Sequence, residues 1–199
     1  MRYAPEHNEA TRQRILESAS RLFREKGVAG VGLAQIMADA GLTVGTFYTH
    51  FRSKETLVRE TLHGSLQARS AEFAIAMRDH DLDAVIRAYL SPEHRDSAGT
   101  GCPIAALASE VARHSRATRQ TFVSQIEPSL AALAKQMSKR RGKRVSRAEA
   151  AALLGLLVGT LQLARATPNR AESGDVLEAG IRAALQLAGG KPSRRIACA

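Results

Sequence analysis

Apolar residues recur at helical spacing along almost the whole chain. The first apolar face, formed by Ile15, Ala19, Leu22 and Phe23, follows positions i, i+4, i+7 and i+8 and ends at Gly27. No stretch keeps the apolar–polar alternation that marks a strand. The pattern predicts an all-α protein of about nine helices. After the first, the expected helices cover residues 33–40, 43–50, 53–77, 83–90, 102–112, 122–137, 147–166 and 173–188.

Local signals predict where several of these helices begin, bend or stop. Ser146, with Glu149 three residues later, is typical of a capping box at a helix start. Pro128 lies inside an apolar helical face and should kink that helix. Residues 91–101 contain one proline and two glycines and are expected to form a loop. Residues 191–199 are expected to be a flexible tail.

Composition places the chain among soluble proteins. Of its 199 residues, 44% are apolar and 24% are charged. The start is polar, and the longest uncharged stretch, Ala150–Ala164, is too short to span a bilayer. The two cysteines do not make a disulfide framework, and the histidines lack metal-ligand spacing. We therefore expect a cytoplasmic protein with no membrane segment, metal or cofactor.

The formal net charge of +10 is poor evidence for nucleic-acid binding, because the excess is concentrated away from the N-terminus. Six basic residues lie within Lys139–Arg147, and three more lie in the tail. Residues 1–50 are nearly balanced, with six basic and five acidic side chains. An argument for DNA binding must therefore rest on residue pattern.

Two short helices near the N-terminus carry such a pattern. The expected helices at 33–40 and 43–50 are separated only by Gly41, Leu42 and Thr43. Two helices joined by a turn of three or four residues that contains glycine are typical of a helix-turn-helix. Phe47 and Phe51 lie four residues apart and can anchor the second helix inward.

The outer face of that second helix suits DNA. Threonine can donate, accept or touch a thymine methyl, so Thr46 is a candidate for base contact. Tyr48, His50 and Lys54 are candidates for phosphate contacts, which position a protein without reading sequence. A polar helix followed by a loop is the alternative, but it gives no reason for Gly45, whereas close approach to a groove does.

The N-terminal residues resemble the TetR family of bacterial transcriptional repressors over about sixty positions. The resemblance implies DNA contacts by Thr43, Val44, Thr46, Tyr48, His50 and Lys54. It also implies a diverged C-terminal region that binds an effector, and a homodimer. The matching residues are Ile15, Leu16, Ala19, Leu22, Phe23, Gly27, Ile36, Met37, Ala40, Gly41, Leu42, Thr43, Gly45, Thr46, Phe47, Tyr48, His50, Phe51, Ser53, Lys54, Glu55 and Leu57.

Two positions depart from the family pattern. Gly32 stands where members commonly have a serine or threonine, and Ala34 stands where a polar or basic residue is common. Gln35 is the nearest replacement and is a further candidate DNA contact. The segment Arg2–Arg14 is either an arm that compensates by touching the DNA backbone or minor groove, or a disordered tail with solvated arginines.

The segment 148–164 is apolar around its whole circumference, which indicates burial on all sides. In a chain of this size, burial of the outer side favours a partner subunit, and Gly155 and Gly159 allow close helix approach. A single central core helix is the alternative. A two-fold dimer predicts a palindromic operator. The candidate interface residues on this helix and the last one are Leu153, Leu157, Leu161, Leu177, Ile181 and Leu185.

The middle of the chain should contain the effector pocket, bounded by helices between Thr56 and Leu133. Each candidate lining residue could equally be ordinary core, and with 4% aromatic residues there is no sign of an aromatic cage. The candidates are Leu66, Phe73, Met77, Tyr89, Ile104, Leu107 and Phe122.

Cys102 follows a glycine-containing loop and precedes Pro103 at an expected helix start. A helix N-terminus lowers the pKa of a thiol and raises its reactivity. Some TetR-like proteins have Gly-Cys at this point and use it to sense electrophiles or oxidants. The alternative is a small buried residue packed beneath the loop.

The sequence favours one of three function classes. We predict a ligand-responsive repressor released from a palindromic operator in double-stranded DNA by a small-molecule or electrophile/oxidant effector. A helical protein-interaction adaptor is the alternative. An enzyme is not expected, because the sequence has no Walker loop, no Gly-x-Ser-x-Gly and no zinc spacing. The predicted domains are residues 1–52 for DNA binding, 53–190 for effector binding and dimerisation, and 191–199 as the tail.

Overall fold

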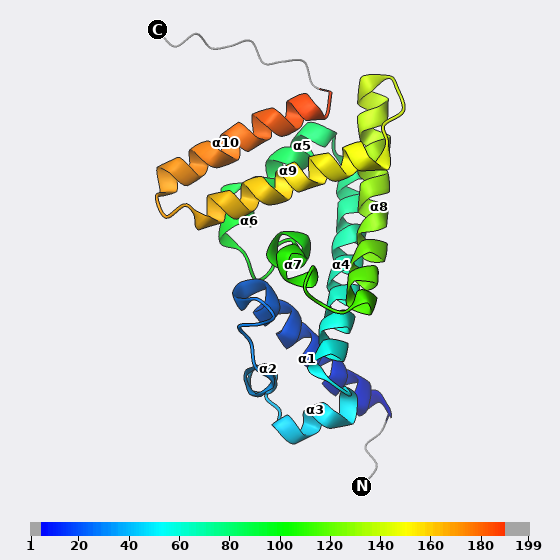
Figure 1. The fold of residues 1–199 in the computed structure, drawn as a ribbon, viewed down its shortest axis with the longest axis vertical. Helices are drawn as coiled ribbons and strands as arrows, with labels where there is room; N and C mark the ends of the chain where they lie inside the picture. Colours follow the sequence, from blue (N-terminus) through cyan, green and yellow to red (C-terminus); the bar gives the residue numbers. More distant parts are fainter. Residues whose placement is uncertain (1–4, 190–199) are drawn as a thin grey trace. The chain divides into compact units, whose positions relative to one another are not determined.

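The computed structural model describes residues 5–189, and all regular elements in this range are helices (Figure 1). The predicted all-α class is confirmed. The predicted tail and Arg2 lie outside the described residues. The helices are α1 (Pro5–Lys26), α2 (Leu33–Asp39), α3 (Val44–His50), α4 (Lys54–Asp79), α5 (Leu82–Tyr89), α6 (Pro92–Asp96), α7 (Pro103–Val111), α8 (Arg116–Arg141), α9 (Arg147–Ala166) and α10 (Arg170–Leu187).

The helix α6 lies where the sequence predicts a loop. Ser91 caps it by accepting from the N–H of His94 at 3.2 Å, and Pro92 occupies its first turn. Tertiary contacts hold it in place. Arg95 donates to Ser173 Oγ at 3.0 Å, and Arg165 donates to the carbonyls of His94 and Arg95 at 2.8 and 2.9 Å. These contacts come from distant residues and have no local sequence signal.

The chain folds into two compact units that are not consecutive in sequence. One contains the residues up to Arg69 together with Ala98–Ile126, and the other contains Ser70–Ser97 together with the residues from Glu127 onward. Helices α4 and α8 each continue from the first unit into the second. α8 continues through Pro128 as one helix. The functional division at residues 52 and 53 stays a prediction.

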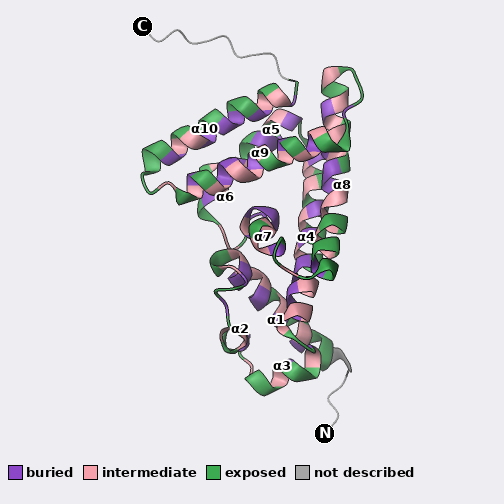
Figure 2. Ribbon diagram, in the orientation of Figure 1, coloured by how far each residue is buried: buried purple, intermediate pink, exposed green. Residues whose placement is uncertain are grey.

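The core of the first unit follows the predicted apolar faces. Ile15, Ala19 and Phe23 of α1 are buried, as are the α2 residues Ile36 and Met37 (Figure 2). These side chains pack with Phe47, Phe51 and Leu57, which tie α3 and the start of α4 to the same core. Burial of apolar surface here fixes where the outer face of α3 points.

In the second unit, α9 and α10 lie side by side as an antiparallel pair (Figure 1). They approach closely where Gly180 meets Thr160: a Cβ on Gly180 would lie 2.2 Å from Thr160 Cγ2. The predicted capping box at the start of α9 is confirmed, with Ser146 and Glu149 bonding each other's backbone N–H groups.

The predicted dimer-interface residues require a correction. Leu153, Leu157, Leu161, Leu177 and Ile181 are buried within a single chain because they form the α9–α10 core, and Leu185 is half-buried. The five buried residues are therefore not free to meet a partner, while a contact by Leu185 stays a prediction. The outward side of α9 instead presents Gly155, Leu156, Gly159 and Leu163, and the Leu163 side chain is 65% exposed.

Among the described helices, α9 has the length and composition that could cross a membrane. One side of it nevertheless belongs to the core shared with α10, including Leu157 and Thr160. Packing against α10 thus accounts for the apolar residues on that side of α9.

Candidate nucleic-acid interface

Helices α2 and α3 form the predicted helix-turn-helix. Gly41 adopts a φ of 67°, the left-handed conformation that ends helices and favours glycine. The next residue, Leu42, donates its N–H to Met37 O at 2.8 Å, so the turn closes tightly. Gly32 and Thr43 are the N-cap residues of α2 and α3; Gly32 has no side chain to donate or accept, and the Thr43 side chain makes no cap hydrogen bond.

One side of α3 is held and the other is open. Phe47 is fully buried and stacks on Phe51, with ring centroids 5.5 Å apart. On the opposite side, Val44 is 42% exposed and Tyr48 is 66% exposed, and Gly45 lies beside them without contacts that a Cβ would violate. α3 therefore presents a small, partly apolar surface that no described part of the chain covers.

Three threonines border this surface. The hydroxyls of Thr43 and Thr46 lie 3.0 Å apart and can exchange one hydrogen bond. Thr49 donates to Thr46 O at 2.7 Å and is thus engaged with its own helix. Thr43 and Thr49 are exposed and Thr46 is half-buried, so each hydroxyl remains accessible from the open side.

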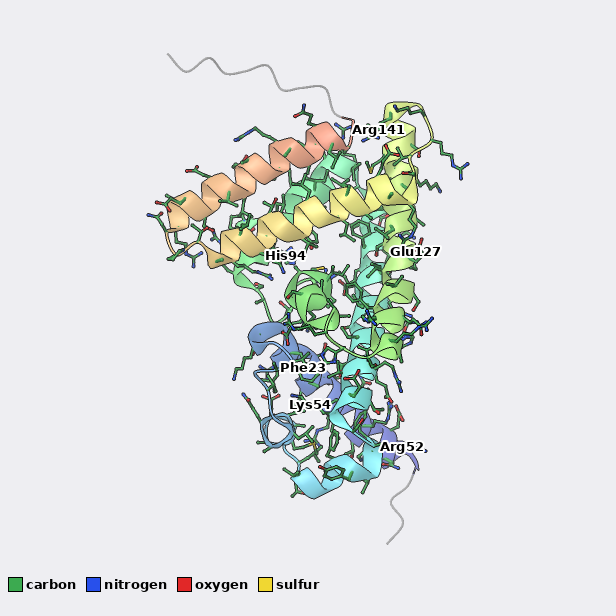
Figure 3. The ribbon with its side chains drawn as sticks, in the orientation of Figure 1. Phe23, Arg52, Lys54, His94, Glu127 and Arg141 are labelled. Carbon is green, nitrogen blue, oxygen red and sulfur yellow. The ribbon has the colours of Figure 1, made fainter. Side chains whose placement is uncertain are left out.

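Lys54 is occupied within the chain. Its ammonium donates to Val28 O at 2.7 Å and to Val31 O at 2.6 Å, which ties the start of α4 to the α1–α2 loop (Figure 3). A lysine ammonium has three N–H groups, so at most one is left for a phosphate. The predicted phosphate contact stays a prediction, but the structure adds a positioning role that the sequence did not indicate.

His50 and Gln35 are both half-buried. Burial and then the positive charge of Arg12 lower the pKa of His50. In the free protein the neutral imidazole is therefore favoured, and it can still donate an N–H to a phosphate. The sequence-based interpretation did not distinguish this from a charged contact.

The described part of the segment Arg2–Arg14 is helical, which contradicts the disordered tail, while its contact with DNA stays a prediction. α1 begins at Pro5, so these residues are helical. Arg12 pairs with Glu60 and lies 5.0 Å from the centroid of the Phe51 ring, and Arg14 donates to Ala40 O. Both arginines contact groups that are distant in sequence, and these contacts stabilise the N-terminal helices.

Two carboxylates beside this domain escaped the sequence analysis. Glu55 accepts from Thr118 Oγ1 at 2.6 Å, His114 Nδ1 at 2.8 Å and the Ser115 N–H at 3.4 Å. Burial alone would raise the pKa of Glu55, but these hydrogen bonds outweigh it and lower the pKa to about 2. Glu110 accepts from the Ala29 N–H at 3.0 Å. Their partners lie 59 to 81 residues away, beyond any local pattern.

The candidate effector residues divide between the two units. Leu66, Leu107 and Phe122 belong to the first, and Phe73, Met77 and Tyr89 belong to the second. Leu66, Met77 and Leu107 are buried, as is Ile104, while the three aromatic residues are half-buried. Their role as lining residues stays a prediction.

Cys102 is the N-cap residue of α7, as expected, and its side chain is only 2% exposed. Reactive cysteines are usually partly exposed. The burial therefore favours the packing role for Cys102 in this state of the protein.

Comparison with known proteins supports the interpretation of the N-terminal helices. Residues 15–61 match the family model described as bacterial regulatory proteins, tetR family. The chain is 42% identical over 62 residues to the HTH-type transcriptional regulator TtgR of Pseudomonas putida, covering 31% of this chain and 30% of TtgR. It is 28% identical over 116 residues to the HTH-type transcriptional repressor KstR2 of Rhodococcus jostii, covering 58% of this chain and 57% of KstR2. The matches thus span under two thirds of these curated relatives.

Solved structures extend the likeness to the whole fold. A TetR-family transcriptional regulator from Cytophaga hutchinsonii superposes with a TM-score of 0.73 at 23% identity, covering 98% of this chain and all of the other. The reduced form of E. coli NemR gives a TM-score of 0.72 at 21% identity, covering 89% of this chain and 96% of the other. Residues 15–61 thus match the helix-turn-helix region of the tetR family, and the described chain has the same all-helical fold as these solved regulators.

Proposed function

We propose that this protein is a cytoplasmic, dimeric repressor that binds a palindromic operator in double-stranded DNA and is released by an effector. The observation that carries the proposal is the open side of α3, where Val44, Gly45 and Tyr48 are exposed while Phe47 on the opposite side is fully buried. A face held rigidly from behind and free in front is suited to enter a major groove.

The residues of this surface have different proposed roles. Val44 and the Thr46 methyl can touch thymine methyls, and the Thr46 hydroxyl can hydrogen-bond a base edge. Tyr48, Thr43 and His50 can donate to phosphate oxygens, and Gln35 supports them from α2. Gly45 keeps the helix free of a side chain where the groove wall would approach.

Substitutions in α3 should separate sequence reading from phosphate contact. We expect Tyr48→Phe to weaken binding to all DNA sequences by a similar factor, and Thr46→Ala to change preference among sequences by about 1–3 kcal/mol. The measurement is fluorescence anisotropy with the promoter region beside the protein's own gene and with single-base variants, at several salt concentrations.

The control for this experiment is Gly45→Ala. A Cβ at Gly45 meets nothing closer than Thr43 Oγ1 at 3.9 Å, so the free protein should fold normally while DNA affinity falls. Wild-type protein that binds no DNA with a steep salt dependence would contradict the proposal and favour the adaptor alternative.

The proposed dimer uses the outward side of α9. Gly155, Gly159 and Leu163 lie on one line along the helix, and Cβ atoms added at either glycine would meet no other atom within 4 Å. Small residues allow two helices to approach closely, and an exposed leucine beside them supplies apolar surface to bury. A two-fold axis at this face would pair α9 with α9 and bring α10 of each subunit alongside.

The effector is a small molecule or an electrophile or oxidant. The thiol of Cys102 would have to become accessible to act as a sensor, because it is buried here. We expect Cys102→Ser to abolish release from the operator by a peroxide or electrophile if the thiol is the sensor. The measurement is operator binding before and after treatment, with Cys198→Ser as the matched control. Unchanged release from DNA by the Cys102→Ser protein would leave the thiol a packing residue and a non-covalent ligand as the effector.

A further inference from the structure

We propose that Glu55 and Glu110 position the recognition helix α3 from outside the helix-turn-helix, through the corner between α7 and α8. This inference rests on the proposed function of α3 and adds a route by which the rest of the chain controls it. The two carboxylates are positioning residues, since neither lies on the open side of α3.

The first connection joins α4 to α8. Glu55 is in the first turn of α4, and its carboxylate meets the N-terminal end of α8 through Ser115 N–H and Thr118 Oγ1. His114, which precedes that helix, supplies a third donor. Three donors converging on one carboxylate give a directional link, which fixes orientation more tightly than apolar contact does.

The second connection joins α7 to the loop between α1 and α2. Glu110, in the last turn of α7, accepts from the Ala29 N–H. Its carboxylate also lies against Gly27, where an added Cβ would be 2.4 Å from Glu110 Oε1. Gly27 has a φ of 76°, the left-handed conformation that favours glycine here. The loop that leads into α2 is thereby held from α7.

Lys54 completes the arrangement. Its ammonium holds the carbonyls of Val28 and Val31 while Glu110 holds the N–H of Ala29, so one short loop is held between opposite charges from α4 and α7. α2 and α3 follow this loop directly. A shift of the α7–α8 corner would therefore be passed to both ends of the helix-turn-helix.

A cavity of about 330 Å³ lies among these groups, lined by Val28, Lys54, Glu55, Val58, Glu110 and His114, among others. Helix α7 also packs on α1, with Leu107 and Val111 buried. The charged side chains at the cavity add directional hydrogen bonds to this apolar contact. Both α4 and α8 continue from this point into the second compact unit, so displacement of either helix reaches the same contacts.

Hydrogen exchange of the free protein tests this without DNA. We expect Glu110→Ala to speed exchange of the Ala29 amide about tenfold, because its acceptor is lost, and to speed exchange in α3 as well. Glu55→Ala should speed exchange in the first turn of α8 and in α3. Glu110→Gln keeps an acceptor oxygen of the same reach and should restore most of the protection. Glu178→Gln, on the exposed side of α10, is the matched control.

The salt dependence of DNA binding distinguishes a residue that positions α3 from one that contacts a phosphate. If the variants lower the fraction of protein whose α3 is correctly placed, affinity falls about tenfold while the slope of affinity against salt stays that of the wild type. Loss of a phosphate contact would reduce that slope. Unchanged exchange in α3 for both alanine variants, with melting temperatures like the control, would overturn the inference even if DNA binds. Altered exchange in a protein that binds no DNA would support the positioning and overturn the proposed function instead.

Discussion

Leu163→Glu is expected to convert the dimer to a monomer and to lower operator affinity at least about 100-fold. Leu163 is the most exposed leucine on the outward side of α9, so a subunit interface at this face would bury it. Two-fold symmetry would bring the two introduced carboxylates together, away from water and without partners, which costs several kcal/mol. Light scattering after size-exclusion chromatography gives the mass, and anisotropy gives the affinity.

Val123→Glu is the matched control for that substitution. Val123 is 49% exposed on α8 and belongs to the other compact unit, so the same change of charge should leave mass and affinity close to wild type. A Leu163→Glu protein that remains dimeric would place the subunit contact elsewhere. Equal losses for both variants would indicate a general effect of charge.

Gly180→Ala is expected to destabilise the protein by about 1–3 kcal/mol, the usual cost of overpacking a core. A loss of stability would be informative, because replacing glycine by alanine normally stabilises a helix by up to about 1 kcal/mol. At Gly180 the new methyl would lie 2.2 Å from Thr160 Cγ2 and 2.6 Å from Thr160 Oγ1, so α9 and α10 would have to separate. Urea denaturation measures the loss.

Two further variants make the Gly180 result specific. Thr160→Ala removes both of the closest atoms and should recover much of the stability lost by Gly180→Ala in the double variant. Gly174→Ala lies on the same helix with nothing within 4 Å of the new Cβ and should be neutral or stabilising. If Gly180→Ala behaves like Gly174→Ala, the close α9–α10 approach is wrong.

Local patterns were sufficient to predict most of the helices and the element that bears the proposed function. The faces around Ile15 and Phe23, the Gly41 turn and the Ser146 capping box each involve residues within a few positions of one another. Such interactions are set by helix geometry alone. Helix α6 has a local start signal in Ser91 and Pro92, but the glycines that follow favour a loop, and the contacts that hold it join Arg95 and Arg165 to residues about 70 or more positions away.

The direction of each side chain was harder to predict where a helix is apolar on every side. The sequence of α9 indicates burial on every side and predicts Leu153, Leu157 and Leu161 at the subunit interface. Only the packing of α10 decides that these three leucines face inward and that Leu163 faces out. The spacing of apolar residues predicts which sides of a helix are buried. Which element packs on each side depends on the whole fold.

The sequence alone thus established a TetR-like helix-turn-helix with Phe47 inward and Tyr48 outward, because four residues return a helix to the same side. Tertiary structure alone shows which charged groups near the helix-turn-helix have partners within the chain. Lys54, Arg12 and Arg14 look free in sequence but are recruited by Val28, Glu60 and Ala40. Lysine and arginine side chains are long and can reach residues far away in the sequence. Their partners can therefore be identified only in the folded chain.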